Sequence, residues 1–347
     1  MLKILKIRQP DDWHLHLRDG EILKSILKET IRDFKRAIIM PNLIPPILNS
    51  DDVLRYQNEI LSALPEGSSF KPLMTIYLTD KSDYKDIVSA YSSDLISAVK
   101  LYPAGATTNS QAGVTNLDKI QALLEKLAEA KVPICIHGET TLPSVDIFDR
   151  EAFFIEKTLE PIRKKIPGLK IILEHITTKQ GIDYVLSESE GLAGTITTHH
   201  LIINRNDLLA NGIKPHYYCL PIAKREEHRL ALRQAATSGD KRFFLGTDSA
   251  PHIDSLKENS CGCAGIFSAT NTMSYLAHVF EEENALHQLE KFTSINGPNF
   301  YNKKINEEIC TLYKHENPVI FPEKIEIGNK SITLFNPGFH SHWSTQG

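Results

Sequence analysis

The sequence predicts an α/β protein, specifically a (β/α)8 (TIM) barrel of the kind that carries its active site at the carboxyl ends of the strands. Short apolar runs rich in β-branched residues alternate with longer amphipathic stretches, which is typical of βαβ units and a parallel sheet. Eight such runs are present in the chain of 347 residues. Such a barrel usually needs about 250 residues, so roughly the first 300 fit one barrel with long loops.

The expected strands and helices follow one another in regular order. An open doubly wound sheet is the competing fold, but no glycine-rich phosphate loop follows the first strand, and this disfavours it. The strand runs lie at 13–17, 36–40, 72–78, 96–101, 133–137, 169–174, 193–197 and 243–245. Helices are expected at 22–31, 51–64, 84–91, 117–130, 149–166, 179–188 and 224–238, with further helical segments at 268–280 and 285–292.

After Pro298 the chain changes character. It is poor in helical patterns and strand-like at 319–321 and 331–334. We see no internal repeat and no low-complexity linker that would separate two domains. We therefore expect a single domain over 1–347, in which about 300–347 form a C-terminal tail that packs back on the barrel.

Composition excludes several classes of protein. The formal net charge is −4 and the basic residues are spread through the chain, so no basic stripe is available for nucleic acid. The N-terminal residues do not resemble a signal peptide, and no run approaches the roughly 20 apolar residues of a membrane span. Five cysteines without an export signal suggest reduced thiols. We expect a cytoplasmic protein without membrane or nucleic-acid partners.

The first expected strand carries two histidines that should act together. Because side chains alternate along a strand, His14 and His16 should project to one side while the intervening leucine faces the other. Arg18 follows closely and offers a guanidinium fork that suits a carboxylate. The alternative is an amphipathic edge strand with two solvated histidines.

Polar side chains also follow other expected strands. The carboxyl ends of parallel barrel strands meet on one face, so these side chains should converge. Singly, each histidine would more often be structural, but imidazoles together with a carboxylate are what a cation such as Zn²⁺ binds. The residues are His14 and His16 on the first strand, Asn42 after the second, Lys100 on the fourth, His137 on the fifth, His175 after the sixth, and Asp248 and His252 after the eighth.

Lys100 is the unexpected member of this group. An ammonium has no lone pair and is repelled by a cation. Crowding with cations lowers the lysine pKa, and the neutral amine can take up CO₂ to form a carbamate whose two oxygens bridge a metal pair. The alternative is a barrel lysine paired with a carboxylate.

These residues stand within longer motifs. The motifs are Asp11-Asp12-Trp13-His14-Leu15-His16-Leu17-Arg18-Asp19-Gly20, Met40-Pro41-Asn42, Lys100-Leu101-Tyr102-Pro103, His137-Gly138-Glu139, Glu174-His175-Ile176-Thr177-Thr178, Tyr218-Cys219-Leu220-Pro221, Gly246-Thr247-Asp248-Ser249-Ala250-Pro251-His252 and Ser260-Cys261-Gly262-Cys263-Ala264-Gly265. Over nearly the whole chain they resemble the dihydroorotases of the amidohydrolase superfamily, in particular the shorter bacterial type. The His-x-His pair marks only the superfamily, whereas Arg18, Asn42, His252 and the Cys-Gly-Cys-Ala-Gly stretch narrow the resemblance.

The resemblance implies a binuclear zinc centre. Two Zn²⁺ per chain would be bridged by carboxylated Lys100 (N6-carboxylysine) and a hydroxide, which would be the nucleophile. Asp248 would act as general base and acid. One zinc would be held by His14, His16 and Asp248, and the other by His137 and His175.

The resemblance also implies a substrate site. Arg18, Asn42 and His252 would receive the substrate carboxylate, with backbone contacts from Leu220 and Ala264, and His137 would also contact the substrate. A flexible loop with Thr107 and Thr108 at its tip would close over the site. Two departures from the family pattern concern loops: Thr197-Thr198-His199-His200 stands where Thr-Pro-Gln-His is expected, and Gly105 stands where Asn is familiar.

The implied activity is the zinc-dependent, reversible cyclisation of N-carbamoyl-L-aspartate to L-dihydroorotate in pyrimidine (UMP) biosynthesis, by a homodimer. A metal lowers the pKa of bound water toward about 7, which suits hydrolysis of a cyclic amide. One alternative is another enzyme on the same barrel, a hydantoinase or allantoinase. The other alternative is a catalytically inactive homologue that serves as an assembly scaffold, and such a protein would have lost metal ligands.

A few other residues carry weaker signals. Cys219, Cys261 and Cys263 lack a fourth ligand at finger spacing, so packing thiols are favoured over a third metal site. Glu139 and Glu174 flank expected ligands, and either an orienting role or an ordinary surface position fits them.

Overall fold

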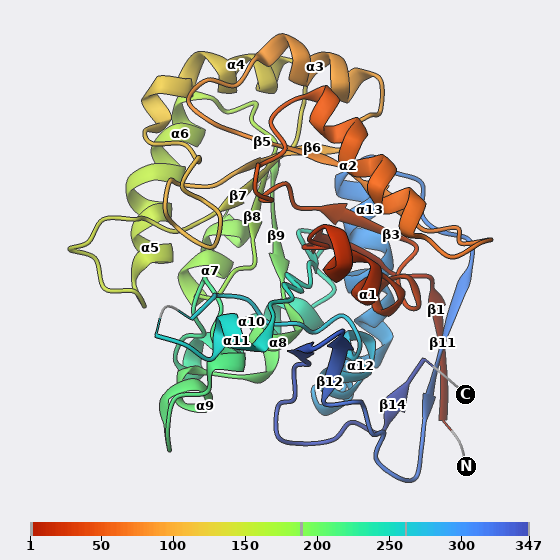
Figure 1. The fold of residues 1–347 in the computed structure, drawn as a ribbon. Helices are drawn as coiled ribbons and strands as arrows, with labels where there is room; N and C mark the ends of the chain where they lie inside the picture. The colour runs from red at the N-terminus through yellow and green to blue at the C-terminus, as the bar shows by residue number, and fades with distance from the viewer. Residues whose placement is uncertain (1–2, 188–189, 261, 346–347) are drawn as a thin grey trace.

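Parallel strands close into a barrel in the computed structural model, which describes residues 3–187, 190–260 and 262–345 (Figure 1). The predicted (β/α)8 fold is confirmed. The strands pair in parallel in the orders β2-β3-β4 and β5-β6-β7-β8-β9-β10. Their bounds are β2 (Asp11–Leu15), β3 (Arg36–Ile39), β4 (Lys71–Leu73), β5 (Thr75–Tyr77), β6 (Ala98–Leu101), β7 (Ile134–His137), β8 (Ile171–Glu174), β9 (Leu192–Ile196) and β10 (Phe243–Leu245).

The ring closes between the first and last strands. Leu15 bridges Ser249 in parallel, the Asp248 N–H donates to the His14 carbonyl at 2.8 Å, and the His16 N–H donates to the Ser249 carbonyl at 3.1 Å. The third expected strand is one run in the sequence but two short strands, β4 and β5, in the structure. They separate at Met74, whose carbonyl accepts from Ser97.

The strands are buried on both faces, which explains their nearly continuous apolar runs. Successive residues alternate between two clusters. On β3, Ile38 belongs to the cluster around Trp13 and Phe244, while Ala37 and Ile39 belong to the cluster that the helices cover. This period of two determines which strand residues can reach the barrel mouth.

Helices surround the strands (Figure 1). α2 illustrates why they form where they do: the Asn49 side chain caps its N-terminus by accepting from the Asp52 N–H, and Val53, Tyr56 and Ile60 form its buried stripe. The helices between strands are α1 (Gly20–Ile31), α2 (Ser50–Ala63), α3 (Tyr84–Ser92), η1 (Leu117–Ile120) with α4 (Gln121–Glu129), α5 (Arg150–Phe154) with η2 (Ile155–Leu159) and α6 (Glu160–Lys165), α7 (Lys179–Ser187) and α10 (Glu226–Thr237).

Short helices in the long loops were not expected from the sequence. α8 (Thr198–Ile202), α9 (Arg205–Leu209) and η3 (Pro215–Tyr217) follow β9, and α11 (Asp254–Lys257) follows β10. The helical segments predicted near the end are present as α12 (Thr272–Glu282), η4 (Leu286–Gln288), η5 (Lys291–Ile295) and α13 (Asn296–Phe300). None of the helices in the described part of the chain is long and apolar enough to cross a membrane.

The two ends of the chain form a sheet outside the barrel (Figure 1). β1 (Lys3–Arg8) pairs antiparallel with β11 (Ile309–Lys314), which also pairs with β14 (Trp343–Ser344). β12 (Lys324–Ile327) and β13 (Lys330–Thr333) form a hairpin, so the strand expected at 331–334 is confirmed. The strand expected at 319–321 is wrong, because prolines flank this segment and cannot donate to a ladder.

Candidate metal and substrate site

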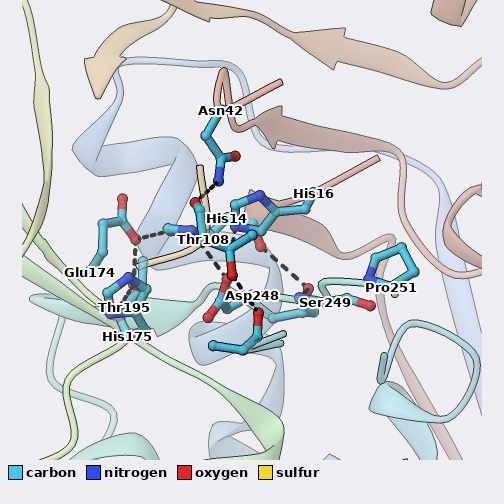
Figure 2. A network of polar contacts seen from close by, with 12 residues as sticks. His14, His16, Asn42, Thr108, Glu174, His175, Thr195, Asp248, Ser249 and Pro251 are labelled. Carbon is cyan, nitrogen blue, oxygen red and sulfur yellow. Dashed lines mark hydrogen bonds and ion pairs between the residues drawn. The ribbon is translucent and has the colours of Figure 1, made fainter. Parts of the chain in front are cut away.

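Imidazoles and a carboxylate meet at the carboxyl ends of the barrel strands (Figure 2). His16 Nε2 lies 3.0 Å and His14 Nε2 lies 3.5 Å from the same oxygen of Asp248, Oδ1. The His175 ring centroid lies 5.0 Å from that of His14 and 4.8 Å from that of His137. These five residues come from four segments that are far apart in the sequence, and they meet in one buried place, as the convergence of strand ends predicts.

The amine of Lys100 reaches this group from β6. Its side chain is fully buried, and Nζ has no hydrogen-bond partner within the described part of the chain. It lies 4.8 Å from the centre of the Tyr102 ring. Burial lowers the pKa of Lys100, although the charge of Glu174 opposes this. An amine with a lowered pKa and no partner among the described residues suits conversion to a carbamate. Conversion would also explain why a polar nitrogen is buried without a hydrogen bond.

Two buried glutamates orient the histidines. Glu174 Oε2 lies 2.8 Å from His14 Nδ1 and accepts from the Thr195 hydroxyl at 2.5 Å. Glu139 Oε2 lies 2.8 Å from His137 Nε2. Both glutamates are about 1% exposed, so their interpretation as ordinary surface groups is wrong. A proton on His14 Nδ1 leaves the Nε2 lone pair facing Asp248, as a metal ligand requires.

The protonation states of the site follow from burial and charge. Burial lowers the pKa of His14 and of His175 well below the usual value, so both imidazoles are neutral and able to bind a cation. Burial opposes ionisation of Asp248, but the hydrogen bond from His16 at 3.0 Å holds its pKa below the usual value. Asp248 is thus a carboxylate at neutral pH.

Three site residues adopt left-handed backbone conformations that no motif revealed. φ is 58° at Arg18, 41° at His175 and 46° at Asp248. This conformation is uncommon for residues other than glycine and costs of order 1–3 kcal/mol each. It occurs directly after β8 and three residues after the ends of β2 and β10, where the chain leaves the barrel strands.

The predicted carboxylate-binding residues lie beside the metal ligands. Arg18 Nη2 lies 3.0 Å from His252 Nε2, and Arg18 Nε donates to the Pro251 carbonyl at 3.1 Å. The His252 Nε2 atom also lies 3.0 Å from the Ala264 carbonyl. Burial and the charge of Arg18 lower the pKa of His252 to about 2, so this imidazole is neutral and Arg18 carries the local positive charge.

The loop tip covers the site in this structure (Figure 2). Asn42 Nδ2 donates to the Thr108 carbonyl at 3.0 Å, and the Thr108 hydroxyl donates to the Ala264 carbonyl at 3.2 Å. The remaining cavity measures about 20 Å³, little more than one water molecule needs. A heterocyclic substrate can enter only if the loop moves. The cavity is lined by His14, His16, Arg18, Asn42, Tyr102, Thr107, Thr108, His175, Leu220, Asp248, Ala250, Ala264 and Gly265.

Most of the predicted site residues line this cavity, and the others adjoin it. Lys100, His137 and His252 do not line it but lie next to Tyr102, His175 and Arg18, as the distances above show. The sequence did not identify Tyr102 as a residue that lines the cavity, although Tyr102 lies within the Lys100-Leu101-Tyr102-Pro103 motif.

Among the described cysteines, Cys219 lies in a group of possible metal ligands, but the hydrogen bonds of that group disfavour a further metal centre. Cys219 is buried next to His199 and His200, and donor atoms of these three residues lie within 4.8 Å of one another. However, His200 Nδ1 lies 2.9 Å from the Thr197 hydroxyl and His200 Nε2 lies 3.0 Å from the Pro221 carbonyl, so both ring nitrogens are already engaged. Cys261 lies outside the described residues.

Comparisons with known proteins agree with this geometry. Residues 11–306 match the amidohydrolase family. A dihydroorotase of Ruegeria sp. (strain TM1040) is 60% identical over 344 residues, which is 99% of each chain. A dihydroorotase of Agrobacterium fabrum is 60% identical over 342 residues, again 99% of each chain.

Solved structures extend the comparison to the fold. The dihydroorotase of Campylobacter jejuni superposes with a TM-score of 0.90 at 36% identity, covering 100% of this chain and 98% of the other. The Saccharomyces cerevisiae dihydroorotase in complex with 5-fluoroorotic acid gives 0.89 at 33% identity, covering 98% of both chains. An L-hydantoinase from Arthrobacter aurescens gives 0.80 at 13% identity over 98% of this chain and 82% of the other, which shows a shared fold alone.

Proposed function

The chain belongs to the dihydroorotases of the amidohydrolase family, and on that premise we propose how its residues perform the reaction. It is a hydrolase of a cyclic amide that interconverts N-carbamoyl-L-aspartate and L-dihydroorotate, a step of pyrimidine biosynthesis. One observation carries the residue assignment: buried imidazoles, a carboxylate and an amine without a partner among the described residues lie together, with Arg18 and His252 beside them.

We propose that this point holds two zinc ions. Bound there, the ions would lower the pKa of water and polarise the amide carbonyl. The four buried imidazoles, at or just after the strand ends, fit the requirements of zinc. Lys100 fits as a carboxylated bridge because its amine has no other partner within the described residues. The first zinc would be held by His14, His16 and Asp248, the second by His137 and His175, and Lys100 would bridge them.

Asp248 is proposed as the group that moves the proton. Asp248 is ionised at neutral pH, and only this carboxylate form can accept a proton from the attacking water. It then returns this proton to the ring nitrogen that leaves. The same carboxylate works in the direction of ring closure, where it takes the proton from the carbamoyl nitrogen.

The wall beside the metal ligands is proposed to bind the substrate carboxylate. Arg18 supplies the charge and a guanidinium fork, and Asn42 and the neutral His252 can complete the carboxylate's hydrogen bonds. Leu220 and Ala264 line the cavity and offer backbone groups. His137, whose ring centroid lies 4.8 Å from that of His175, is proposed to contact the substrate as well as metal. The tip at Thr107 and Thr108 excludes water once substrate is bound.

A dihydroorotate hydrolysis assay with metal analysis tests this assignment. Zinc-replete protein should hydrolyse L-dihydroorotate and contain about two zinc ions per chain. Absence of turnover in zinc-replete protein, or clearly fewer than two metals per active chain, would refute the binuclear assignment. Turnover of hydantoin at a rate comparable to dihydroorotate would instead support a hydantoinase-like site.

Three broader proposals rest on the resemblance. The chain is proposed to form one domain over 1–347, supported by the pairing of β1 with β11 and by the hydrogen bond from the Ser274 hydroxyl to the Trp343 carbonyl. It is proposed to act as a homodimer in the cytoplasm. Light scattering of the purified protein and cell fractionation test the last two.

A further inference from the structure

A buried lysine behind the carboxylate wall has no assigned role. Lys257 is the last residue of α11, and only 5% of it is exposed. Its ammonium donates to three main-chain carbonyls: Tyr218 at 3.2 Å, Cys263 at 2.9 Å and Gly265 at 2.6 Å. One cation therefore joins two segments that are far apart in the sequence. Tyr218 precedes Lys257 by 39 residues and Gly265 follows it by 8.

These two segments carry the backbone of the substrate pocket. Leu220 and Ala264 both line the cavity. The Cys263 carbonyl points toward Lys257, and a trans peptide unit is planar, so the Ala264 N–H on the same unit points away from the lysine. The segments also bond directly, because the Gly265 N–H donates to the Tyr218 carbonyl at 3.0 Å.

The same segment is where the loop tip docks. The Ala264 carbonyl accepts from the Thr108 hydroxyl at 3.2 Å and lies 3.0 Å from His252 Nε2. Gly265 must approach the neighbouring chain closely, since a Cβ there would lie 2.8 Å from the Ala250 carbonyl oxygen. A segment packed this tightly, with its carbonyls drawn to one cation, has little freedom to adjust to a ligand.

We propose that Lys257 is a positioning residue for the substrate carboxylate. It does not touch the substrate. It holds 218–220 and 263–265 so that the Leu220 and Ala264 backbones and the docked Thr108 form one preorganised wall next to Arg18. This inference rests on the proposed roles of Arg18, Leu220 and Ala264 in carboxylate binding. Loss of the ammonium should therefore weaken binding of carboxylated ligands and leave the chemical step nearly unchanged.

The test compares Lys257→Met with a control at Lys324, the first residue of β12, which binds the same short helix from outside it. Lys324 donates to Asp254, the first residue of α11, at 2.8 Å, so Lys324→Met perturbs α11 without touching the two segments. In the zinc-loaded Lys257→Met protein we expect KM for dihydroorotate and Kd for orotate to rise about tenfold, the loss expected for hydrogen bonds to a charged group. Zinc content should match wild type and kcat should stay within about twofold, and the Lys324→Met protein should show no rise in KM.

An unchanged KM in folded Lys257→Met protein, or an equal rise in Lys324→Met, would overturn the inference. Lys257→Gln keeps a neutral donor and replaces the Met variant if the latter does not fold, with the same direction expected. These outcomes can be told apart from a failure of the proposed function. Wild-type protein without dihydroorotate turnover would refute that function. An active wild type with unaffected variants would refute only the role of Lys257.

Discussion

The buried carboxylate of Asp12 binds Thr247 twice, accepting from its N–H at 2.9 Å and from its hydroxyl at 2.6 Å. The same carboxylate accepts from the His14 N–H at 3.1 Å. Asp12 lies on the first barrel strand and Thr247 follows the last, so this pair joins the strands at the seam. It thereby places His14 next to Asp248, and the proposed first zinc site depends on it.

Asp12→Asn should therefore weaken both the seam and the metal site. The amide oxygen could keep the two N–H donors, but its NH2 would face the Thr247 hydroxyl, which would lose its acceptor on Asp12. Loss of this hydrogen bond to a buried carboxylate costs about 1–3 kcal/mol. We expect the free energy of unfolding to fall by about that amount and zinc to be retained less tightly, measured by urea denaturation and by dialysis against a chelator. Asp94→Asn is the matched control because Asp94 is 81% exposed at its side chain, and unaltered zinc retention in Asp12→Asn would contradict the role of the seam.

Lys100→Ala should abolish dihydroorotate hydrolysis. The variant loses the proposed bridging carboxylate, and short carboxylic acids should restore part of the activity because they can occupy the space and supply oxygens. Turnover is measured across a series of acetate and propionate concentrations, with wild-type protein as the control for nonspecific salt effects. Full activity without added acid would show that Lys100 does not bridge.

Arg18→Met should raise KM for dihydroorotate by about 10- to 100-fold, since a charge-assisted bond to the carboxylate is lost. Zinc content should remain that of wild type because Arg18 is not among the proposed ligands. Steady-state kinetics and metal analysis check this, with Arg55→Met as control because Arg55 is 61% exposed at its side chain and pairs with Asp52 on the same helix, α2. A wild-type KM would exclude Arg18 from carboxylate recognition.

Glu281 should make stability depend on acid pH. Burial raises its pKa, but hydrogen bonds from Lys314, Trp343 and Lys3 outweigh burial and lower it from the model-compound value of 4.5 to about 2. The folded pKa thus lies below the unfolded pKa. The ionised carboxylate contributes its full stability above about pH 4.5 and loses it as the pH falls toward about 2.

Glu281→Gln should lower the free energy of unfolding near pH 7 by about 1–2 kcal/mol, allowing for solvent screening, and should flatten the acid decline. Urea denaturation at several pH values between about 3 and 7 measures this. Glu129→Gln, at a side chain that is 64% exposed, is the control. Parallel pH profiles for wild type and Glu281→Gln would contradict the expectation.

Much of the site could be predicted because it depends on local rules. The period of two along a strand places His14 and His16 on one side, and chain direction brings strand ends such as His175 and Asp248 to one face of the barrel. Membership in the dihydroorotases could likewise be inferred from short motifs, since their residues are contiguous in the chain.

Other features depend on partners that no local pattern identifies. β1 is a strand because β11 pairs with it from the other end of the chain. Asp12 stood within a recognised motif, yet its bond to Thr247 spans 235 residues. The split at Met74 and the short helix that ends in Lys257 were also missed, because both depend on how neighbouring strands and loops pack.

The sequence by itself determined the order of strands and helices, the family and the chemical types of the site residues, because these follow from hydrophobic periodicity and contiguous motifs. Only the tertiary structure decided which of them meet, which histidine nitrogen faces Asp248, and that the Lys100 amine is buried without a partner within the described residues. Burial, hydrogen-bond satisfaction and pKa all depend on the surroundings of a group, and those surroundings are assembled from segments far apart in the chain.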